Sequence, residues 1–352
     1  MKVVSIVGAR PQFIKAAVLS RELRKEHTEI LVHTGQHYDQ NMSDIFFKEL
    51  GIPDPEYHLG IGSGSHGKQT GAMLAGIEEI LINEKPEWVI VYGDTNSTLA
   101  GALAAVKMHI KVAHVEAGLR SFNQLMPEEI NRVLTDHVSN LLFCPTKTAM
   151  VNLKSEGIIK GAHLIGDVMY EALTWAVEHG KESTAVQEEL GLQPKKFLLA
   201  TIHRAENTDN PERLKRILCA FNQVDEIIIW PVHPRTEKKL EELDWQPSSN
   251  IHLIKPIGYL EMIKLEKNAR IILTDSGGIQ KEAYWLGVPC VTLRDETEWI
   301  ETINSGWNQL AGTDTQSILK AIQTINPSNF KIPDFNHQID SNMYIKLLEN
   351  YR

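Results

Sequence analysis

Short apolar runs alternate with segments of helical polarity along almost the whole chain. In the first part of the sequence the apolar runs are KVVSIV, EILVHT, EWVIVYG, KVAHVEA and NLLFCPT, and each is followed by a polar or helical segment. This alternation is typical of buried strands in parallel βαβ units. The pattern therefore predicts an α/β protein built on a parallel sheet.

A second series of apolar runs follows further along the chain. It reads FLLATIH, EIIIWPVH, IHLIKPI, RIILT, PCVTL and NQLAG, with helical segments such as PERLKRILCAF and SILKAIQTI between them. The segment between the two series is helical and then polar, and strands are sparse in it. We therefore expect two Rossmann-like, doubly wound domains, one over residues 1–166 and one over residues 167–338, with the boundary near Gly166.

Composition narrows the functional class. A chain of 352 residues suggests two domains with cores of ordinary size. The 36 Lys and Arg against 45 Asp and Glu give a net charge of −9, which argues against binding to nucleic acid or to an anionic membrane. An anionic substrate would therefore need a local cluster of cations.

The apolar runs and the cysteines bear on location and on metals. No apolar run approaches the length of a membrane span, so we expect a cytoplasmic protein. Cys144, Cys219 and Cys290 are far apart and form no CxxC or Cys/His metal spacing. We expect all three to be reduced core residues and expect no metal site.

Charged and imidazole side chains recur where the expected strands end. In open α/β sheets, ligands bind beyond the carboxyl ends of the strands. Each such residue alone is also compatible with a structural hydrogen bond, but their recurrence at one edge favours a site. The residues expected to face a single cleft between the domains are Arg10, Lys15, Asp94, Glu116, His203, Arg204 and His233.

The stretch TDSGGIQKEAYWLG follows RIIL and predicts a strand end, a tight turn and a helix. Gly277 and Gly278 would let the backbone approach a ligand, and the N–H groups of a helix start attract an anion. Ser276 would cap the helix or donate its hydroxyl, and Glu282, one turn further, would reach sugar hydroxyls. A phosphate with a ribose attached fits these residues. The alternative is an ordinary turn capped by Asp275 or Ser276.

Two other glycine-containing stretches have features of a phosphate site. GSGSHG, Gly62 to Gly67, has GxGxxG spacing but follows the turn-rich PDPEYHLGI, so we interpret it as a flexible loop and not as a nicotinamide fingerprint. No GxxxxGK[ST] motif is present. The segment from Gly8 to Lys15 is a second candidate, because Arg10 and Lys15 flank a predicted helix start with Pro11 in its first turn.

Several motifs in a fixed order carry a family resemblance. GARPQFIKAA, YGDTNSTLAGALAA, HVEAGLRS, MPEEINR, TIHRAEN, PVHP, TDSGGIQKEA and the run from LRDETEW through AGTD together resemble the non-hydrolysing UDP-N-acetylglucosamine 2-epimerase family over the whole chain. The resemblance implies a GT-B architecture with a nucleotide-sugar in the cleft between two Rossmann-like domains. It also implies a C-terminal helix at 339–352 that returns to the first domain, a homodimer and no cofactor.

The resemblance also implies a reaction and its residues. Members of the family convert UDP-N-acetylglucosamine to UDP-N-acetylmannosamine for surface polysaccharide synthesis, through loss of UDP and a 2-acetamidoglucal intermediate. Asp94, Glu116 and Glu128 match the positions of acid–base carboxylates, without an assignment of the face of C2 that each serves. His203 matches an active-site histidine that contacts the diphosphate or assists proton transfer.

The binding residues that the resemblance implies meet the nucleotide. Glu282 matches a ribose-binding carboxylate. The leaving diphosphate would be stabilised by Arg10, by Lys15 and by the turn that contains Ser276, Gly277 and Gly278.

The chain departs from the family pattern at several positions. Trp299, in TEWIE, stands where a binding arginine is common, Ala205 changes HRRE to HRAE, and Lys281 replaces a common glutamate. Tyr38, in TGQHYDQNMS, stands where the family's second, regulatory UDP-N-acetylglucosamine site has an arginine, which leaves allosteric control an open question.

Other activities stay open at this level. GARPQFIKAA and GSHGKQTG resemble the branch that epimerises UDP-2,3-diacetamido-glucuronate, so that substrate is the second expectation. A GT-B glycosyltransferase, a hydrolysing epimerase and a non-catalytic nucleotide-sugar sensor are further alternatives. The carboxylates of the first domain favour epimerisation over these.

Overall fold

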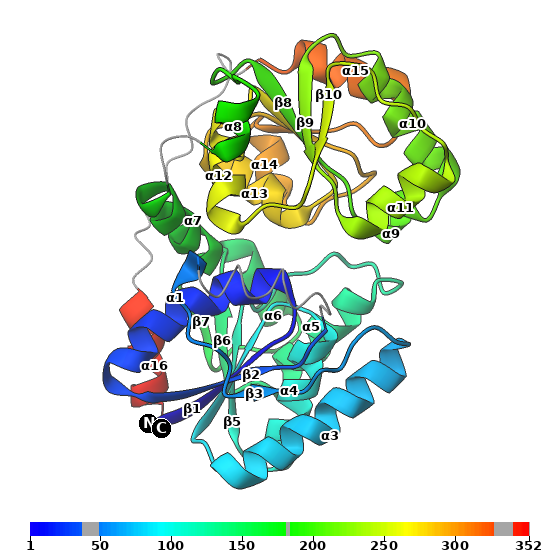
Figure 1. Ribbon diagram of the computed structural model, residues 1–352. Coiled ribbons are helices and arrows are strands. Elements are labelled where there is room, and N and C mark those ends of the chain that lie inside the picture. The colour runs from blue at the N-terminus through cyan, green and yellow to red at the C-terminus, as the bar shows by residue number, and fades with distance from the viewer. Residues whose placement is uncertain (37–48, 181–183, 327–340, 352) are drawn as a thin grey trace. The chain divides into compact units, whose positions relative to one another are not determined.

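The chain forms two compact units, each with its own parallel sheet (Figure 1). The computed structural model describes residues 1–36, 49–180, 184–326 and 341–351. Unit 1 comprises Met1–Thr174 and His337–Arg352, and unit 2 comprises Trp175–Asn336. The predicted α/β class with two Rossmann-like parallel sheets is confirmed.

Unit 1 has a seven-stranded sheet in the order β3-β2-β1-β4-β5-β6-β7. Its strands are β1 (Lys2–Val7), β2 (Thr28–His33), β3 (Tyr57–His58), β4 (Trp88–Tyr92), β5 (Lys111–Val115), β6 (Leu141–Cys144) and β7 (Ala162–Leu164). The helices are α1 (Arg10–Glu26), α3 (His66–Glu84), α4 (Asn96–Lys107), α5 (Pro127–Val138), α6 (Lys147–Ser155) and α16 (Ser341–Asn350), and α7 (Val168–His179) includes the boundary with unit 2.

Unit 2 has a six-stranded sheet in the order β10-β9-β8-β11-β12-β13. The strands are β8 (Phe197–Thr201), β9 (Ile227–Pro231), β10 (Ile251–Ile254), β11 (Ile271–Thr274), β12 (Cys290–Thr292) and β13 (Asn308–Leu310). The helices are α8 (Ala185–Glu189), α9 (Ala205–Thr208), α10 (Pro211–Asn222), α11 (Pro234–Glu242), α12 (Tyr259–Asn268), α13 (Gly277–Trp285), α14 (Ile300–Asn304) and α15 (Thr315–Thr324).

Both sheets reverse their strand order at one place. In unit 1 the reversal lies between β1 and β4, and in unit 2 it lies between β8 and β11. Ile6 pairs with Val91, and Thr201 pairs with Thr274, so the two strands at each reversal end side by side. Ligands of open α/β sheets bind beyond the strands at this switch point. Each unit therefore has one place where its topology favours a site.

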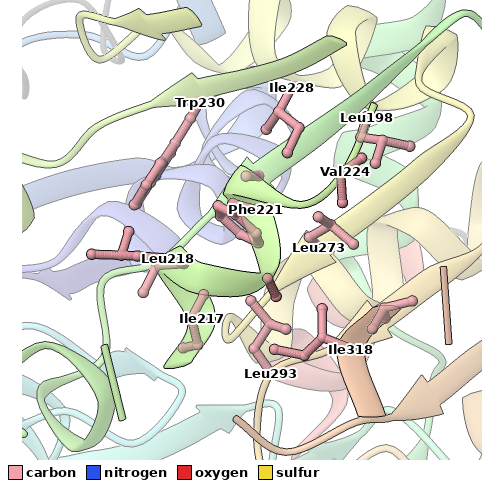
Figure 2. Packing of buried hydrophobic residues seen from close by; sticks show 14 of the residues in the cluster. Leu198, Ile217, Leu218, Phe221, Val224, Ile228, Trp230, Leu273, Leu293 and Ile318 are labelled. Carbon is pink, nitrogen blue, oxygen red and sulfur yellow. The ribbon is translucent and has the colours of Figure 1, made fainter. Parts of the chain in front are cut away.

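Side chains point alternately to the two faces of each sheet, and both faces are buried. In unit 2, Phe221 of α10 lies among Leu198, Ile228 and Leu273 of the sheet (Figure 2). The Phe221 ring meets Trp230 edge-on with centroids 5.5 Å apart. Burial of each such side chain contributes about 1.5–3 kcal/mol, so the helices hold the sheet and its switch point rigidly.

Helix α16 packs within unit 1. Tyr344 contacts Phe143 of β6 edge-on at 4.8 Å between ring centroids, and Tyr351 contacts Trp88 of β4 in the same way at 5.3 Å. Glu349 Oε1 lies 3.0 Å from His27 Nε2. These aromatic contacts cover the sheet face that α1 also covers.

Two expectations about loops and strands were wrong. The stretch GSGSHG is not a loop throughout, because Ser65 is the N-cap of α3 and the helix begins at His66. The short strands β3 and β7 were not anticipated, since runs of two and three residues give too little periodicity to recognise.

The cysteine prediction was correct for two residues and wrong for the third. Cys144 and Cys290 are buried, free thiols, and burial raises the pKa of each to about 12. Cys219 is exposed. It lies on α10 away from the buried stripe of Leu214, Ile217, Leu218 and Phe221, which faces the sheet. In the part of the chain that the structure describes, no helix is long and apolar enough to cross a membrane.

Candidate functional site

Gln12 ties together the two turns at the switch point of unit 1. Its Oε1 accepts hydrogen bonds from the backbone N–H groups of Gly8 and Ala9 at 2.8 and 3.0 Å. Its Nε2 donates to the carbonyl of Tyr92 at 2.7 Å and to the hydroxyl of Thr95 at 3.0 Å. The turn after β1 is therefore fixed to the turn after β4 by a single buried amide.

Gly8 is required by packing. A Cβ at this position would overlap Ser97 Oγ and Thr34 Oγ1, which are themselves hydrogen-bonded at 2.8 Å. The amides of Gly8 and Ala9 already have a partner in Gln12. The start of α1 thus lacks the open amides of a phosphate loop, and Arg10, half-buried at the first position of α1, is the cation that this turn places at the sheet edge.

Glu116, directly after β5, forms a buried ion pair with Lys15 of α1. Both side chains are less than a tenth exposed, at 9% and 8%. Glu116 adopts a positive φ of 74°, which is costly for a residue with a Cβ and is common at functional sites. A Cβ on Gly93, whose φ is also positive at 64°, would lie 3.2 Å from Lys15 Nζ. The chain therefore adopts a costly backbone conformation at Glu116, and this conformation brings the Glu116 side chain to Lys15.

Asp94 is paired with Arg132 of α5, and its side chain is one third exposed at 33%. The side chain of Asn131 donates to the Asp94 carbonyl at 3.0 Å. Arg132 also contacts Glu129 at 3.0 Å. Asp94 is thus a carboxylate with a fixed guanidinium on one side and solvent on the other.

Glu128 is an exposed residue in the first turn of α5. It precedes Arg132 by four residues, so both side chains lie on the same face of the helix. Within the described residues no hydrogen bond or ion pair is assigned to Glu128. Its neighbour Glu129 is buried and accepts from the backbone N–H groups of Ser121 and Phe122 at 2.9 Å each, so Glu129 shapes the segment before the helix.

A buried ionic network supports these carboxylates and was not recognised from the sequence. His114 Nδ1 lies 2.7 Å from Asp136 Oδ1, and its Nε2 lies 2.7 Å from the Gly93 carbonyl oxygen. His114 therefore bridges the Asp136 carboxylate and the turn that precedes Asp94. Arg120 Nη1 donates to Asp136 Oδ2 at 2.7 Å. Burial acts to raise the pKa of Asp136, but His114 and Arg120 together lower it.

In unit 2, Asp275 anchors the turn after β8. Its fully buried carboxylate accepts from the backbone N–H groups of His203 and Arg204 at 3.1 Å each and from Asn207 Nδ2 at 3.0 Å. The alternative in which Asp275 caps α13 is therefore wrong. His203 has a side chain that is 44% exposed, with Nδ1 3.5 Å from Asp275 Oδ1. His233, by contrast, caps α11 by accepting from the Arg235 N–H at 3.2 Å.

The start of α13 is open at Gly278. Ser276 is the N-cap, and its side chain makes no capping hydrogen bond to the helix start. A Cβ on Gly278 would meet only Ser276 Oγ, at 3.8 Å, whereas a Cβ on Gly277 would overlap the Glu298 carboxylate. Packing therefore explains the glycine at 277 but not the one at 278. Glu282, which is buried, follows one turn into the helix.

Two arginines and a carboxylate lie beside this helix start. Glu298 Oε2 is 3.0 Å from Arg294 Nη1, and Glu298 Oε1 is 3.7 Å from Arg204 Nη2. Burial acts to raise the pKa of Glu298, but Arg294 and Arg204 lower it, so the group is ionised. The start of α13 therefore lies beside two guanidinium groups that share one buried carboxylate.

Lys281 is enclosed by indoles. Its Nζ lies 4.1 Å from the ring centroid of Trp299 and 5.4 Å from that of Trp285. The residue is only 4% exposed. The lysine that replaces a glutamate of the family pattern is therefore covered by the tryptophan that replaces an arginine.

Comparison with known proteins assigns the family. Residues 21–346 match the family model described as UDP-N-acetylglucosamine 2-epimerase. The chain belongs to the UDP-N-acetylglucosamine 2-epimerase family. It is an isomerase with a GT-B-like fold, as the sequence motifs predicted.

Relatives of this epimerase include two curated proteins. It is 57% identical to a UDP-N-acetylglucosamine 2-epimerase homolog of Methanococcus maripaludis, over 100% of this chain and 99% of the relative. It is 51% identical to the UDP-2,3-diacetamido-2,3-dideoxy-D-glucuronate 2-epimerase of Pseudomonas aeruginosa, over 92% of each chain.

A solved structure is also similar. The crystal structure of Methanocaldococcus jannaschii UDP-GlcNAc 2-epimerase in complex with UDP-GlcNAc and UDP superposes with a TM-score of 0.92 at 45% identity, covering 99% of both chains. The likeness therefore extends over the whole fold.

The expectations about a regulatory site and about metal binding concern residues outside the turns described above. Tyr38, on which the question of a regulatory site depends, lies outside the residues that the structure describes. Over the described ranges, no group of three or more His, Cys, Asp or Glu side chains is arranged to hold a metal ion.

Proposed function

We propose that this epimerase converts UDP-N-acetylglucosamine to UDP-N-acetylmannosamine by inverting C2 without net hydrolysis. The observation that carries the proposal is the pair of carboxylates at neighbouring strand ends of unit 1, each paired with a cation. Glu116 is held against Lys15, and Asp94 against Arg132. Epimerisation needs proton transfer on both faces of one carbon, so more than one carboxylate is required.

The chemistry begins with departure of UDP. The C2 proton is not next to a carbonyl, so it becomes acidic only as C1 turns cationic. The C1–O bond breaks with its electron pair going to the β-phosphate oxygen, a base takes the C2 proton, and the C1–C2 double bond of 2-acetamidoglucal forms. The phosphate oxygen then attacks C1 again, and an acid delivers a proton to the opposite face of C2.

The carboxylates of unit 1 serve the proton transfers in this proposal. Lys15 holds Glu116 in place, and Arg132 does the same for Asp94. Glu128 shares its helix face with Arg132 and is exposed, so it is available to a sugar. We assign these three residues to acid–base chemistry as a group.

The α13 turn of unit 2 serves the leaving group. Ser276, Gly277 and Gly278 present the N-terminus of a nine-residue helix, which favours the charge that develops on the diphosphate. Glu282 follows one turn later, where a carboxylate accepts hydrogen bonds from ribose hydroxyls. His203 and Arg10 complete the proposal as a half-exposed imidazole and a guanidinium that contact the diphosphate.

UDP-2,3-diacetamido-2,3-dideoxy-glucuronate is the second candidate substrate. The 51% identity to the Pseudomonas aeruginosa enzyme of that name favours it. Burial of Lys281 beneath Trp299 argues against that lysine as the direct partner of the extra carboxylate. A side-by-side measurement of kcat/KM decides between the two. Preference for the uronate by more than about tenfold, or roughly 1.4 kcal/mol, would replace the first candidate by the second.

The remaining parts of the proposal concern assembly and setting. We infer a cytoplasmic homodimer that supplies surface polysaccharide synthesis. Exposed apolar side chains on α5 and just before it supply a surface that a second copy would cover; they are Phe122, Leu125, Ile130 and Leu134. Light scattering should give twice the chain mass of 39.7 kDa, and a monomer would refute this part alone.

Product analysis tests the activity. With UDP-N-acetylglucosamine alone, proton NMR should show UDP-N-acetylmannosamine accumulating to an equilibrium with the starting material. Stoichiometric release of free N-acetylmannosamine and UDP would instead identify a hydrolysing epimerase. No change in either nucleotide-sugar candidate, together with tight binding, would support a sensor.

A further inference from the structure

Trp299 places a buried hydrogen-bond donor at the start of α13. The side chain is 5% exposed, and its indole Nε1 has no hydrogen-bond partner among the described residues. Nε1 lies 3.2 Å from the position that a Cβ on Gly277 would occupy. The donor is therefore aimed at the first turn of the helix.

The surroundings hold the indole in this orientation. Lys281 Nζ lies 4.1 Å from the ring centroid, and the Trp299 backbone N–H donates to Thr297 Oγ1 at 3.1 Å. Thr297 Oγ1 donates in turn to Gln280 Oε1 at 2.6 Å. The ring is thus held against α13 by Lys281, and the backbone of Trp299 is tied to the same helix through Thr297 and Gln280.

A buried donor without a partner is costly, and an acceptor in the site would relieve that cost. The charge around the donor selects the kind of acceptor. Arg294 and Arg204 lie beside the helix start, which itself carries partial positive charge. The acceptor that fits is an anion.

The position along α13 selects which anionic group it is. Glu282, the proposed ribose contact, lies one turn into the helix, and Gly277 begins it. In a nucleoside diphosphate the β-phosphate is the phosphate farther from the ribose. A group beside Gly277 is therefore placed for the β-phosphate.

We propose that the Trp299 indole N–H donates a hydrogen bond to the β-phosphate of the bound nucleotide. It is a neutral, rigid donor at the position where the family pattern has a flexible guanidinium. The inference rests on the proposed function, because it takes UDP as the nucleotide. Relative to arginine, tryptophan lacks the positive charge but holds its N–H donor in one direction. In this proposal Trp299 contacts the leaving group.

Calorimetric titration of Trp299→Phe with UDP, UMP and uridine tests the proposal. Phenylalanine keeps an aromatic ring beside Lys281, and it removes the donor together with the second ring of the indole. Loss of a hydrogen bond to a charged acceptor should weaken UDP binding about tenfold while changing UMP and uridine binding less than about twofold. Trp245→Phe is the matched control, since Trp245 also has a buried indole N–H without a partner in the described part of unit 2. It should leave all three affinities unchanged.

The outcomes separate this inference from the proposed function. If the unaltered protein binds UDP and Trp299→Phe binds it equally well, the inference is wrong and the function stands. Equal weakening of UDP and UMP would also overturn the assignment to the β-phosphate. If the unaltered protein binds no UDP, both fail. Should the variant not fold, indole N–H NMR signals of the unaltered protein decide, because the Trp299 signal should shift with UDP and stay in place with uridine.

Discussion

The turns at the two switch points begin from similar sequence patterns and end in opposite states. Both follow a buried strand, contain glycine and begin a helix, α1 in unit 1 and α13 in unit 2. In unit 1, Gln12 occupies the backbone amides and Gly8 makes room for Ser97 and Thr34. In unit 2, Gly278 has no such neighbour, and a buried indole N–H points at the turn. A glycine turn therefore indicates a phosphate site only where the chain leaves its donors open.

The difference fits the proposal that unit 1 carries the proton transfers and unit 2 binds the leaving group. Unit 1 uses its closed turn as a rigid base for Glu116 and Asp94, each paired with a cation. Unit 2 keeps a helix start available for an anion.

The largest expected effect is on turnover by the carboxylates of unit 1. Glu116→Gln, Asp94→Asn and Glu128→Gln should each lower kcat by about 10²-fold or more, the scale of a general acid or base, while UDP affinity is retained. Glu79→Gln, at an exposed position of α3, is the control and should be silent. Steady-state kinetics and UDP titration measure both quantities. Normal turnover in all three variants would remove the catalytic assignment of unit 1.

The glycines test the comparison itself. Gly8→Ala should lower the free energy of unfolding by about 1–3 kcal/mol, because the new methyl group overlaps Ser97 and Thr34. Gly278→Ala should not destabilise the fold but should weaken UDP binding at least tenfold, since the methyl group would occupy ligand space. Gly71→Ala, where a Cβ meets nothing within 4 Å, is the control for a helical glycine. Denaturant unfolding measures stability, and calorimetry measures UDP affinity. Normal UDP binding by Gly278→Ala would contradict the comparison of the two turns.

The acid stability of unit 1 should depend on Asp136. Its pKa is lowered in the folded protein, so its stabilising contribution is present above the unfolded pKa of about 3.9 and is lost as the pH falls through the lower folded value. Asp136→Asn removes this contribution and leaves Arg120 and His114 without their anion. The variant should therefore have a lower free energy of unfolding at neutral pH, and that free energy should depend less on pH below about 4. Unfolding curves recorded at several pH values measure both effects. An unchanged acid dependence would mean that another group controls it.

The smallest expected effect on stability is that of Ser276→Ala. The Ser276 side chain makes no capping bond, so its removal should change the free energy of unfolding by only a few tenths of a kcal/mol, against about 1 kcal/mol for a working cap. Thr146→Ala supplies the contrast, because Thr146 does cap α6 through the Ala149 N–H. Equal losses in the two variants would show that Ser276 caps α13 after all.

The sequence was informative where local pattern decides structure. Continuous apolar runs located the strands of both sheets, and parallel topology then brought Asp94, Glu116 and the α13 turn to strand ends. The pattern was uninformative for β3 and β7, which are too short to show a period. It also misplaced Cys219, because an apolar neighbourhood along the chain does not say which face of α10 a residue occupies.

Contacts between residues that are far apart in the chain could not be predicted from the sequence. His114 and Asp136 are 22 residues apart, and neither stands out as an ion pair until β5 and α5 pack together. Trp299 was noticed as a departure from the family pattern, but its burial and its unpartnered Nε1 depend on how the segment before α14 folds against α13. Motifs identified the positions, and packing supplied their roles.

The central claim, that C2 is epimerised through loss and return of its proton, is tested most directly by deuterium incorporation. UDP-N-acetylglucosamine is incubated with the enzyme in deuterated water, and the C2 position of both nucleotide-sugars is read by NMR. We expect deuterium at C2 of the UDP-N-acetylmannosamine formed, and incorporation about 10²-fold slower with Glu116→Gln. Epimerised product that retains its original C2 hydrogen would contradict it.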